Sequence, residues 1–190
     1  VELRPEVLSV YKSIIEENHD NVYEILDALS ALVGFKPDFE KELPEVCEDY
    51  LKKQLYYGFN TNNDARKFEK FLHYIGYVPE TLNEAFIAQF DYLLNEEDYS
   101  ALEHMFVILE VRAADELQAY FRDLILNNYK KIIDALLREA KGAMDLVQTS
   151  ITRYKIIPSK DVLIDLLPEA VNKSYGFDRF LLVVNLCGYK

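Results

Sequence analysis

Cysteine is nearly absent from this sequence, with two residues among 190. Two thiols cannot build the disulfide framework that stabilises small secreted domains. Cys47 and Cys187 both stand among apolar neighbours, and free cysteines are among the most frequently buried residues. We therefore expect two reduced, buried thiols and a reducing, cytoplasmic compartment.

Long apolar runs are also missing. No stretch approaches the roughly 18 consecutive apolar residues that a membrane-spanning helix needs, so no membrane association is expected. No N-terminal signal pattern is present either. The sequence opens on Val1 rather than Met, which suggests a fragment of a longer protein. With 50% hydrophobic residues, the chain is long and apolar enough for a single all-helical domain over residues 1–190.

Catalytic signatures are absent as well. None of the six glycines belongs to a P-loop, a dinucleotide-binding turn or a Gly-x-Ser-x-Gly phrase. His104 lies in an apolar helical stretch without a nearby nucleophile signature, which favours a packed or edge histidine over a catalytic base. We expect no catalytic residue and no cofactor, and hence a protein that is not an enzyme.

Metal ligands need a separate test because carboxylates are plentiful. Glu16 and His19 form a Glu-x-x-His motif, and Glu69 and His73 are one helical turn apart. A di-iron carboxylate bundle needs two Glu-x-x-His motifs and two further glutamates facing one interior. Since this chain has one such motif, the sequence predicts no metal site.

Charge is the first feature that the sequence has in abundance. The net charge is −12, and residues 1–110 hold 23 Asp/Glu against 9 Lys/Arg, whereas residues 111–190 hold 10 against 12. An acidic surface repels phosphates, so the N-terminal part is a poor candidate for binding nucleic acid. It suits a protein partner with a basic surface. The alternative is a solvated acidic face that only aids solubility.

Apolar residues recur at helical spacing through most of the chain, which predicts amphipathic helices. Pro44 should kink a helix or delay its start, the helix that passes Gly142 should be either long or broken, and Pro168 should kink another. Asn63 or Asp64 is expected to cap the helix that follows a central loop. The expected apolar segments are residues 6–18, 22–33, 39–51, 68–75, 82–94, 102–111, 115–126, 129–154, 162–167 and 177–184.

A short phrase recurs between these segments. It is Gly-Phe-Lys-Pro-Asp at 34–38 and Gly-Tyr-Val-Pro-Glu at 76–80, and it begins again at Gly188. Glycine takes the left-handed conformation that ends a helix. Proline fits the first position of a helix, and an acidic residue after it complements the helix N-terminus. We therefore expect each phrase to end one helix and begin the next.

The helices repeat as pairs. Pro5, Pro37, Pro79 and Pro158 are separated by 32, 42 and 79 residues, the last being close to two periods of about 40. This period resembles that of HEAT and armadillo repeats over nearly the whole chain. The resemblance implies an all-α solenoid of about four to five antiparallel helix pairs, stacked so that neighbours bury one another's apolar faces. The alternative is an irregular bundle of roughly 8 to 10 helices.

The central segment, residues 56–63, is predicted to be a loop. Its aromatic side chains Tyr56, Tyr57 and Phe59 are candidate interface anchors, with Glu48 and Asp49 as acidic neighbours. We expect these five residues to bind the protein partner, which makes the chain a non-catalytic scaffold or regulatory module. The alternative is that the three aromatics fold down and plug the end of a helix pair.

Two further functions remain open. The Gly-x-x-Pro-Asp junctions also resemble the ends of pentatricopeptide repeats, which implies binding of single-stranded RNA by the C-terminal half. The uneven spacing of the junctions and the surplus of acidic residues depart from the pentatricopeptide pattern. The C-terminal half also carries a series of basic residues, but acidic residues interrupt it, so we expect these basic side chains to form ion pairs within their own helices. A small acidic inhibitor of a basic enzyme site is the other possibility. The basic series is Arg122, Lys130, Lys131, Arg138 and Lys141.

Overall fold

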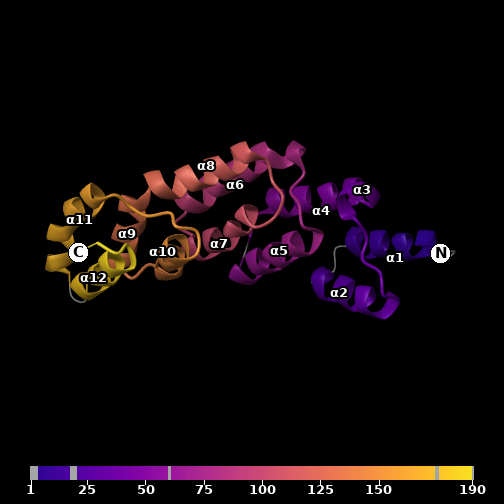
Figure 1. Ribbon diagram of the computed structural model, residues 1–190, viewed down its shortest axis with the longest axis horizontal. Helices are drawn as coiled ribbons and strands as arrows, with labels where there is room; N and C mark the ends of the chain where they lie inside the picture. Colours follow the sequence, from indigo (N-terminus) through magenta and orange to yellow (C-terminus); the bar gives the residue numbers. More distant parts are fainter. Residues whose placement is uncertain (1–3, 18–20, 60, 174–175, 190) are drawn as a thin grey trace. The chain divides into compact units, whose positions relative to one another are not determined.

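The computed structural model describes residues 4–17, 21–59, 61–173 and 176–189, and over these ranges it contains twelve α-helices, two short 3-10 helices and no β-strand (Figure 1). The all-α class predicted from the spacing of apolar residues is confirmed. Within the described part of the chain, no helix is both long and apolar enough to cross a membrane. The stacked-repeat arrangement stays a prediction.

The chain forms two compact units. The first combines Val1–Gln89 with His104–Leu117, and the second combines Phe90–Glu103 with Gln118–Lys190. Three helices cross the division, namely α6 (Asn83–Asn95), α7 (Tyr99–His104) and α8 (Asp115–Asn127).

Helix α1 packs on α2 and α4 in the first unit, while α5 packs on α2, α4 and η2. The elements are α1 (Arg4–Glu16), α2 (Val22–Val33), α3 (Phe39–Glu42), α4 (Pro44–Tyr57), α5 (Asn62–Ile75), η1 (Glu80–Leu82) and η2 (Met105–Leu109).

Tyrosine hydroxyls hold the helices of the first unit in register. The buried Tyr11 hydroxyl of α1 shares a 2.7 Å hydrogen bond with Ser30 Oγ of α2 and donates to the Phe35 carbonyl at 2.8 Å. The Tyr74 hydroxyl of α5 donates to the Leu26 carbonyl of α2 at 2.9 Å. A buried hydroxyl without a partner costs about 1–3 kcal/mol. These bonds therefore select one arrangement of α1, α2 and α5.

The second unit is built around α9 (Tyr129–Leu137). This helix packs against α10 (Ala143–Thr152), α11 (Lys160–Asn172) and α12 (Gly176–Leu186), and α12 also contacts α10 and α11. The buried Tyr129 hydroxyl donates to the Ile156 carbonyl at 2.5 Å and contacts Ser150 Oγ at 2.5 Å. Burial raises the pKa of this phenol well above its usual range. One helix thus contacts three others in this unit, as in a bundle.

The recurring phrase ends helices as predicted but does not begin them as predicted. Gly34 and Gly76 are left-handed caps at the ends of α2 and α5, with φ of 65° and 82°. Pro37, however, lies outside any helix, two residues before α3, and Pro79 is an extended residue before η1. The expected first helical position of both prolines is therefore wrong. Short helical turns intervene before the main helices start.

Several other helix boundaries can be compared with the sequence. Pro44 occupies the first turn of α4, so it delays the helix as predicted. Of the two alternatives for the segment through Gly142, the broken helix is the one found, because α9 ends at Leu137 and α10 starts at Ala143. Thr61, not Asn63 or Asp64, caps α5, through a reciprocal pair of hydrogen bonds with Asp64.

An unpredicted pairing joins two distant segments of the first unit. The Val78 N–H donates to the Arg112 carbonyl at 2.8 Å, and the Arg112 N–H donates to the Gly76 carbonyl at 3.1 Å. Both segments follow helical stretches, after α5 and after η2. The short bridge holds residues 76–78 against Arg112 directly before Pro79.

Gly142 provides a test of the packing in the second unit. Its φ is +79°, and a Cβ there would lie 2.7 Å from Ser100 Cα and still closer to the Ser100 backbone nitrogen and Oγ. Gly142→Ala is therefore expected to lower the free energy of unfolding by about 3 kcal/mol or more, from backbone strain and overpacking combined. Urea unfolding followed by circular dichroism measures this change.

Gly188→Ala is the matched control, because Gly188 has a similar φ of +71° and no atom lies within 4 Å of the position that a Cβ would take there. Only the left-handed backbone cost of roughly 1–2 kcal/mol applies at this residue. Equal losses in the two variants would contradict the close contact with Ser100.

Candidate functional site

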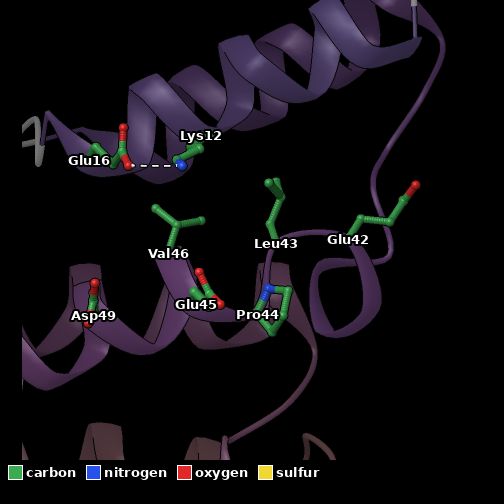
Figure 2. Close-up of a pocket in the computed structure, with 8 residues that line it drawn as sticks. All are labelled: Lys12, Glu16, Glu42, Leu43, Pro44, Glu45, Val46 and Asp49. Carbon is green, nitrogen blue, oxygen red and sulfur yellow. Dashed lines mark ion pairs between the residues drawn. The ribbon is translucent and has the colours of Figure 1, made fainter.

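A groove lies between α1 and the N-terminal half of α4 in the first unit (Figure 2). Its volume is about 470 Å³. Leu43, Pro44 and Val46 provide its apolar surface, while the charged side chains come from both helices and from the end of α3. The full lining is Lys12, Glu16, Glu42, Leu43, Pro44, Glu45, Val46 and Asp49.

The four carboxylates of this groove differ in their partners. Glu16 pairs with Lys12 at 3.6 Å, one turn away on α1. Glu42 accepts hydrogen bonds from the Arg4 guanidinium and from the Asp38 N–H, and these bonds lower the pKa of its carboxyl group.

Glu45 and Asp49 are the two carboxylates available to a ligand. Over the described residues, neither has a basic partner, and both side chains are exposed. They are one helical turn apart on α4, so both project toward the same side of the helix.

The exposed face of α4 continues beyond the groove. A smaller hollow of about 140 Å³ extends along the helix to Lys53. Tyr57 follows Lys53 by four residues and Tyr56 follows Asp49 by seven, which places both tyrosines near the same helical face. Their exposed fractions are 84% for Tyr56 and 74% for Tyr57. Tyrosine is among the residue types that most often anchor protein interfaces.

The predicted loop at 56–63 requires a correction. Tyr56 and Tyr57 belong to the last turn of α4, and their rings meet edge to face at 5.4 Å. The connection begins only at Gly58, whose N–H donates to the Gln54 carbonyl at 3.1 Å, and α5 starts at Asn62. Because the tyrosines are helical, their position relative to Asp49 is fixed by the helix.

The structure separates the remaining predicted residues from this face. The half-buried Phe59 ring packs on Phe68 at a centroid distance of 5.2 Å. For Phe59 this agrees with the alternative prediction, in which the loop aromatics fold down onto the helix pair. Glu48 is half-buried near Tyr77. Burial, followed by Cys47 and the charge of Glu48, raises the pKa of the Tyr77 phenol. Of the five candidate residues, Asp49, Tyr56 and Tyr57 therefore lie on one exposed face.

Two histidines converge on one glutamate elsewhere in the first unit. His104 Nδ1 lies 2.7 Å from Glu69 Oε2, and His73 Nε2 lies 3.9 Å from Glu69 Oε1 and 3.3 Å from Glu110 Oε2. The sequence indicated that Glu69 and His73 lie one helical turn apart. It did not indicate the contact between Glu69 and His104, because the two residues are 35 positions apart. Over the described residues, no set of three or more potential ligands is arranged to hold a metal ion. His19 lies outside these residues.

The thiols are both free, and one is less buried than expected. Cys47 is fully buried, and this burial raises the pKa of its thiol to about 12. Cys187 is only half-buried, so the prediction of two buried cysteines holds for Cys47 alone. Burial raises the pKa of the Cys187 thiol as well, so among the described residues both thiols are shifted away from the reactive thiolate.

Most of the basic series in the second unit is already occupied. The predicted ion pair between residues one helical turn apart is found for Arg138. Arg122, Lys130 and Lys131 instead contact groups in other segments of the chain, so most of these contacts are tertiary. Lys141 is exposed. The contacts are Arg122 with the Tyr154 carbonyl at 3.3 Å, Lys130 with Asp165 at 3.3 Å, Lys131 with the Leu94 carbonyl at 2.8 Å and Arg138 with Asp134 at 3.0 Å.

The chain was compared with protein families, curated proteins and solved structures. No protein-family model matches the chain, and neither a curated protein nor a solved structure matches it. A function must therefore be inferred from the chemistry of the described residues.

The aromatic residues at the end of α4 allow a direct test of which side chains are structural. Tyr56→Ala and Tyr57→Ala should each change the free energy of unfolding by less than about 0.5 kcal/mol, because both rings are exposed. Phe59→Ala should lower the free energy of unfolding by about 1–2 kcal/mol, because it removes the contact with Phe68. The loss is smaller than for a fully buried ring, since Phe59 is half-buried. Denaturant unfolding compares the three variants, and the opposite order would refute this assignment.

Proposed function

We propose that this chain is a non-catalytic interaction module that binds a basic segment of a partner protein along α4. The observation that carries the proposal is the pair of unpartnered groove carboxylates, Glu45 and Asp49, followed on the same helix by the exposed Tyr56 and Tyr57. Acidic and aromatic contacts on one rigid helix offer both charge attraction and anchoring surface.

The groove suits a Lys or Arg side chain in particular. The aliphatic stem of such a side chain packs on apolar surface while its charged end reaches a polar group. Here Leu43, Pro44 and Val46 supply the apolar surface, and Glu45 and Asp49 supply the acceptors. A planar guanidinium can also bond a carboxylate with two parallel N–H groups, so Arg is the preferred residue.

Charge alone would give a weak complex. An exposed ion pair contributes only about 0.2–1 kcal/mol. Aromatic anchors that become buried at the centre of an interface contribute about 2 kcal/mol or more each. We therefore propose that the carboxylates orient the basic segment and accelerate encounter, while Tyr56 and Tyr57 provide most of the affinity.

Nucleic acid is a less suitable partner on the same grounds. The N-terminal part carries the surplus of acidic residues, and phosphate contacts require free cations. In the second unit, Lys130 and Arg138 are bound to Asp165 and Asp134. Binding RNA there would require breaking these ion pairs.

A binding assay with a defined probe tests the proposal. Fluorescence anisotropy of a labelled oligo-arginine peptide should show saturable binding to the chain that weakens as salt is added. Combining Glu45→Lys with Asp49→Lys should weaken binding roughly tenfold or more, which corresponds to 1.4 kcal/mol. Tyr56→Ala combined with Tyr57→Ala should weaken it more strongly, by about 100-fold or more, without changing its salt dependence.

Glu84→Lys is the control for charge reversal, because Glu84 is an exposed carboxylate on α6, in the first unit and outside the groove. It should change affinity less than twofold per reversed charge. Equal weakening by Glu84→Lys would mean that net charge, not the groove, attracts the peptide. Tighter binding of single-stranded RNA than of oligo-arginine would overturn the proposed function.

A further inference from the structure

Two exposed lysines, Lys52 and Lys53, stand between the groove carboxylates and the tyrosines of α4. Over the described residues neither lysine has an ion-pair partner. Lys53 lines the smaller hollow beside the groove together with Asp49. The proposed function uses the carboxylates before these lysines and the tyrosines after them, and it leaves the two lysines without a role.

Helical spacing places one residue of each kind in a single line along α4. At 3.6 residues per turn, positions 45, 49, 52 and 56 lie within about 60° of one another around the helix axis. The helix buries its opposite side, which carries Val46, Cys47, Tyr50, Leu51 and Leu55. From the N-terminal to the C-terminal end, the exposed line therefore reads acidic, acidic, basic and aromatic. Its members are Glu45, Asp49, Lys52 and Tyr56.

Pairing within the helix does not account for these charges. Asp49 stands three residues before Lys52 and four before Lys53, the spacing at which opposite charges pair on a helix surface. Over the described part of the chain, however, no ion pair joins Asp49 to either lysine. On α1 the same spacing does give a pair, since Lys12 lies 3.6 Å from Glu16. The charges of α4 therefore stay available to groups of a partner.

We propose that the segment bound along α4 is bipolar, with basic residues at the groove, acidic residues at Lys52 and Lys53, and apolar residues at the tyrosines. This inference rests on the proposed function and specifies its partner. A uniformly basic segment that reaches from the groove to the tyrosines would place cations against the two lysines. A bipolar segment places an opposite charge against each charged part of the helix, so the lysines determine specificity by repelling the wrong sequence.

The dimensions of α4 define the spacing of such a segment. At a rise of 1.5 Å per residue, the two groove carboxylates lie about 8 Å from the two lysines along the axis, and the lysines lie about 6 Å from the tyrosines. An extended peptide advances about 3.3 Å per residue and turns alternate side chains to one side. About two residues therefore match each part of the helix, and one of each two faces α4.

Fluorescence anisotropy with three labelled peptides of identical composition tests the order of charges. The peptides, blocked at both ends, are Arg-Arg-Glu-Glu-Leu-Leu, its reverse Leu-Leu-Glu-Glu-Arg-Arg, and Glu-Glu-Arg-Arg-Leu-Leu. The wild-type chain should bind one of the first two about tenfold more tightly than the third, in which the acidic residues no longer stand between the basic and the apolar ones. Either direction of the ordered peptide supports the proposal.

Reversing the two lysines tests their role in this preference. Lys52→Glu combined with Lys53→Glu should abolish the preference for the ordered peptide and should tighten binding of oligo-arginine by about tenfold, because repulsion becomes attraction. Arg66→Glu combined with Lys141→Glu is the control, since both residues are exposed, both lie outside α4, and the net charge changes equally. The control should keep the preference, and circular dichroism confirms that both variants retain their helices.

The same assay separates failure of this inference from failure of the proposed function. If neither oligo-arginine nor any of the three peptides binds the wild-type chain, the proposed function is overturned and the bipolar segment with it. If oligo-arginine binds and Glu45→Lys combined with Asp49→Lys weakens it, the proposed function stands. In that case, equal binding of the three peptides, or equal effects of the lysine variant and its control, overturns the bipolar segment alone.

Discussion

Short amphipathic helices that cannot bury their apolar sides alone impose the main constraint on this protein. Helix α2, for example, has 12 residues, a length at which an isolated helix is marginal in water. Burial between helices supplies the stability, and it also encloses tyrosines whose hydroxyls need partners. Tyr11, Tyr74 and Tyr129 each donate to a backbone carbonyl in another segment. These bonds turn a general apolar attraction into one specific packing within each unit.

The same constraint leaves α4 with one free side. Its buried residues, including Val46, Cys47, Tyr50 and Leu51, contribute to the core of the first unit, so the positions between them face water. Glu45 also benefits the helix itself, because an acidic residue in the first turn complements the helix dipole. The helix dipole does not explain Asp49, which lies in the second turn of α4, and it does not explain the two exposed tyrosines at the C-terminal end of α4. The proposed binding role accounts for all four residues together, whereas helix stability accounts for Glu45 alone.

The sequence predicted what depends on local spacing and missed what depends on tertiary contacts. Helical periodicity indicated the all-α class, and glycine chemistry indicated the helix ends at Gly34 and Gly76. Pro79 precedes only the short η1, and the residues before it pair with Arg112, a contact between distant segments that local spacing does not indicate. Asp49, Tyr56 and Tyr57 were named as candidates by residue type, and they stay predictions; Glu45 was not named, because only the packing of α1 beside α4 creates the groove. The repeat period remains a prediction from the sequence.

The central claim is that α4 presents a specific binding face, and backbone NMR shifts test it most directly. Titrating the isotope-labelled chain with unlabelled oligo-arginine should shift the amide signals of residues 12–16 on α1 and 44–57 on α4. These two segments hold residues that line the groove and the smaller hollow beside it, and α4 continues to the exposed tyrosines. Signals of α11 and α12 should stay unchanged in the same titration. Shifts spread evenly over the acidic surface, or confined to α11 and α12, would contradict the account.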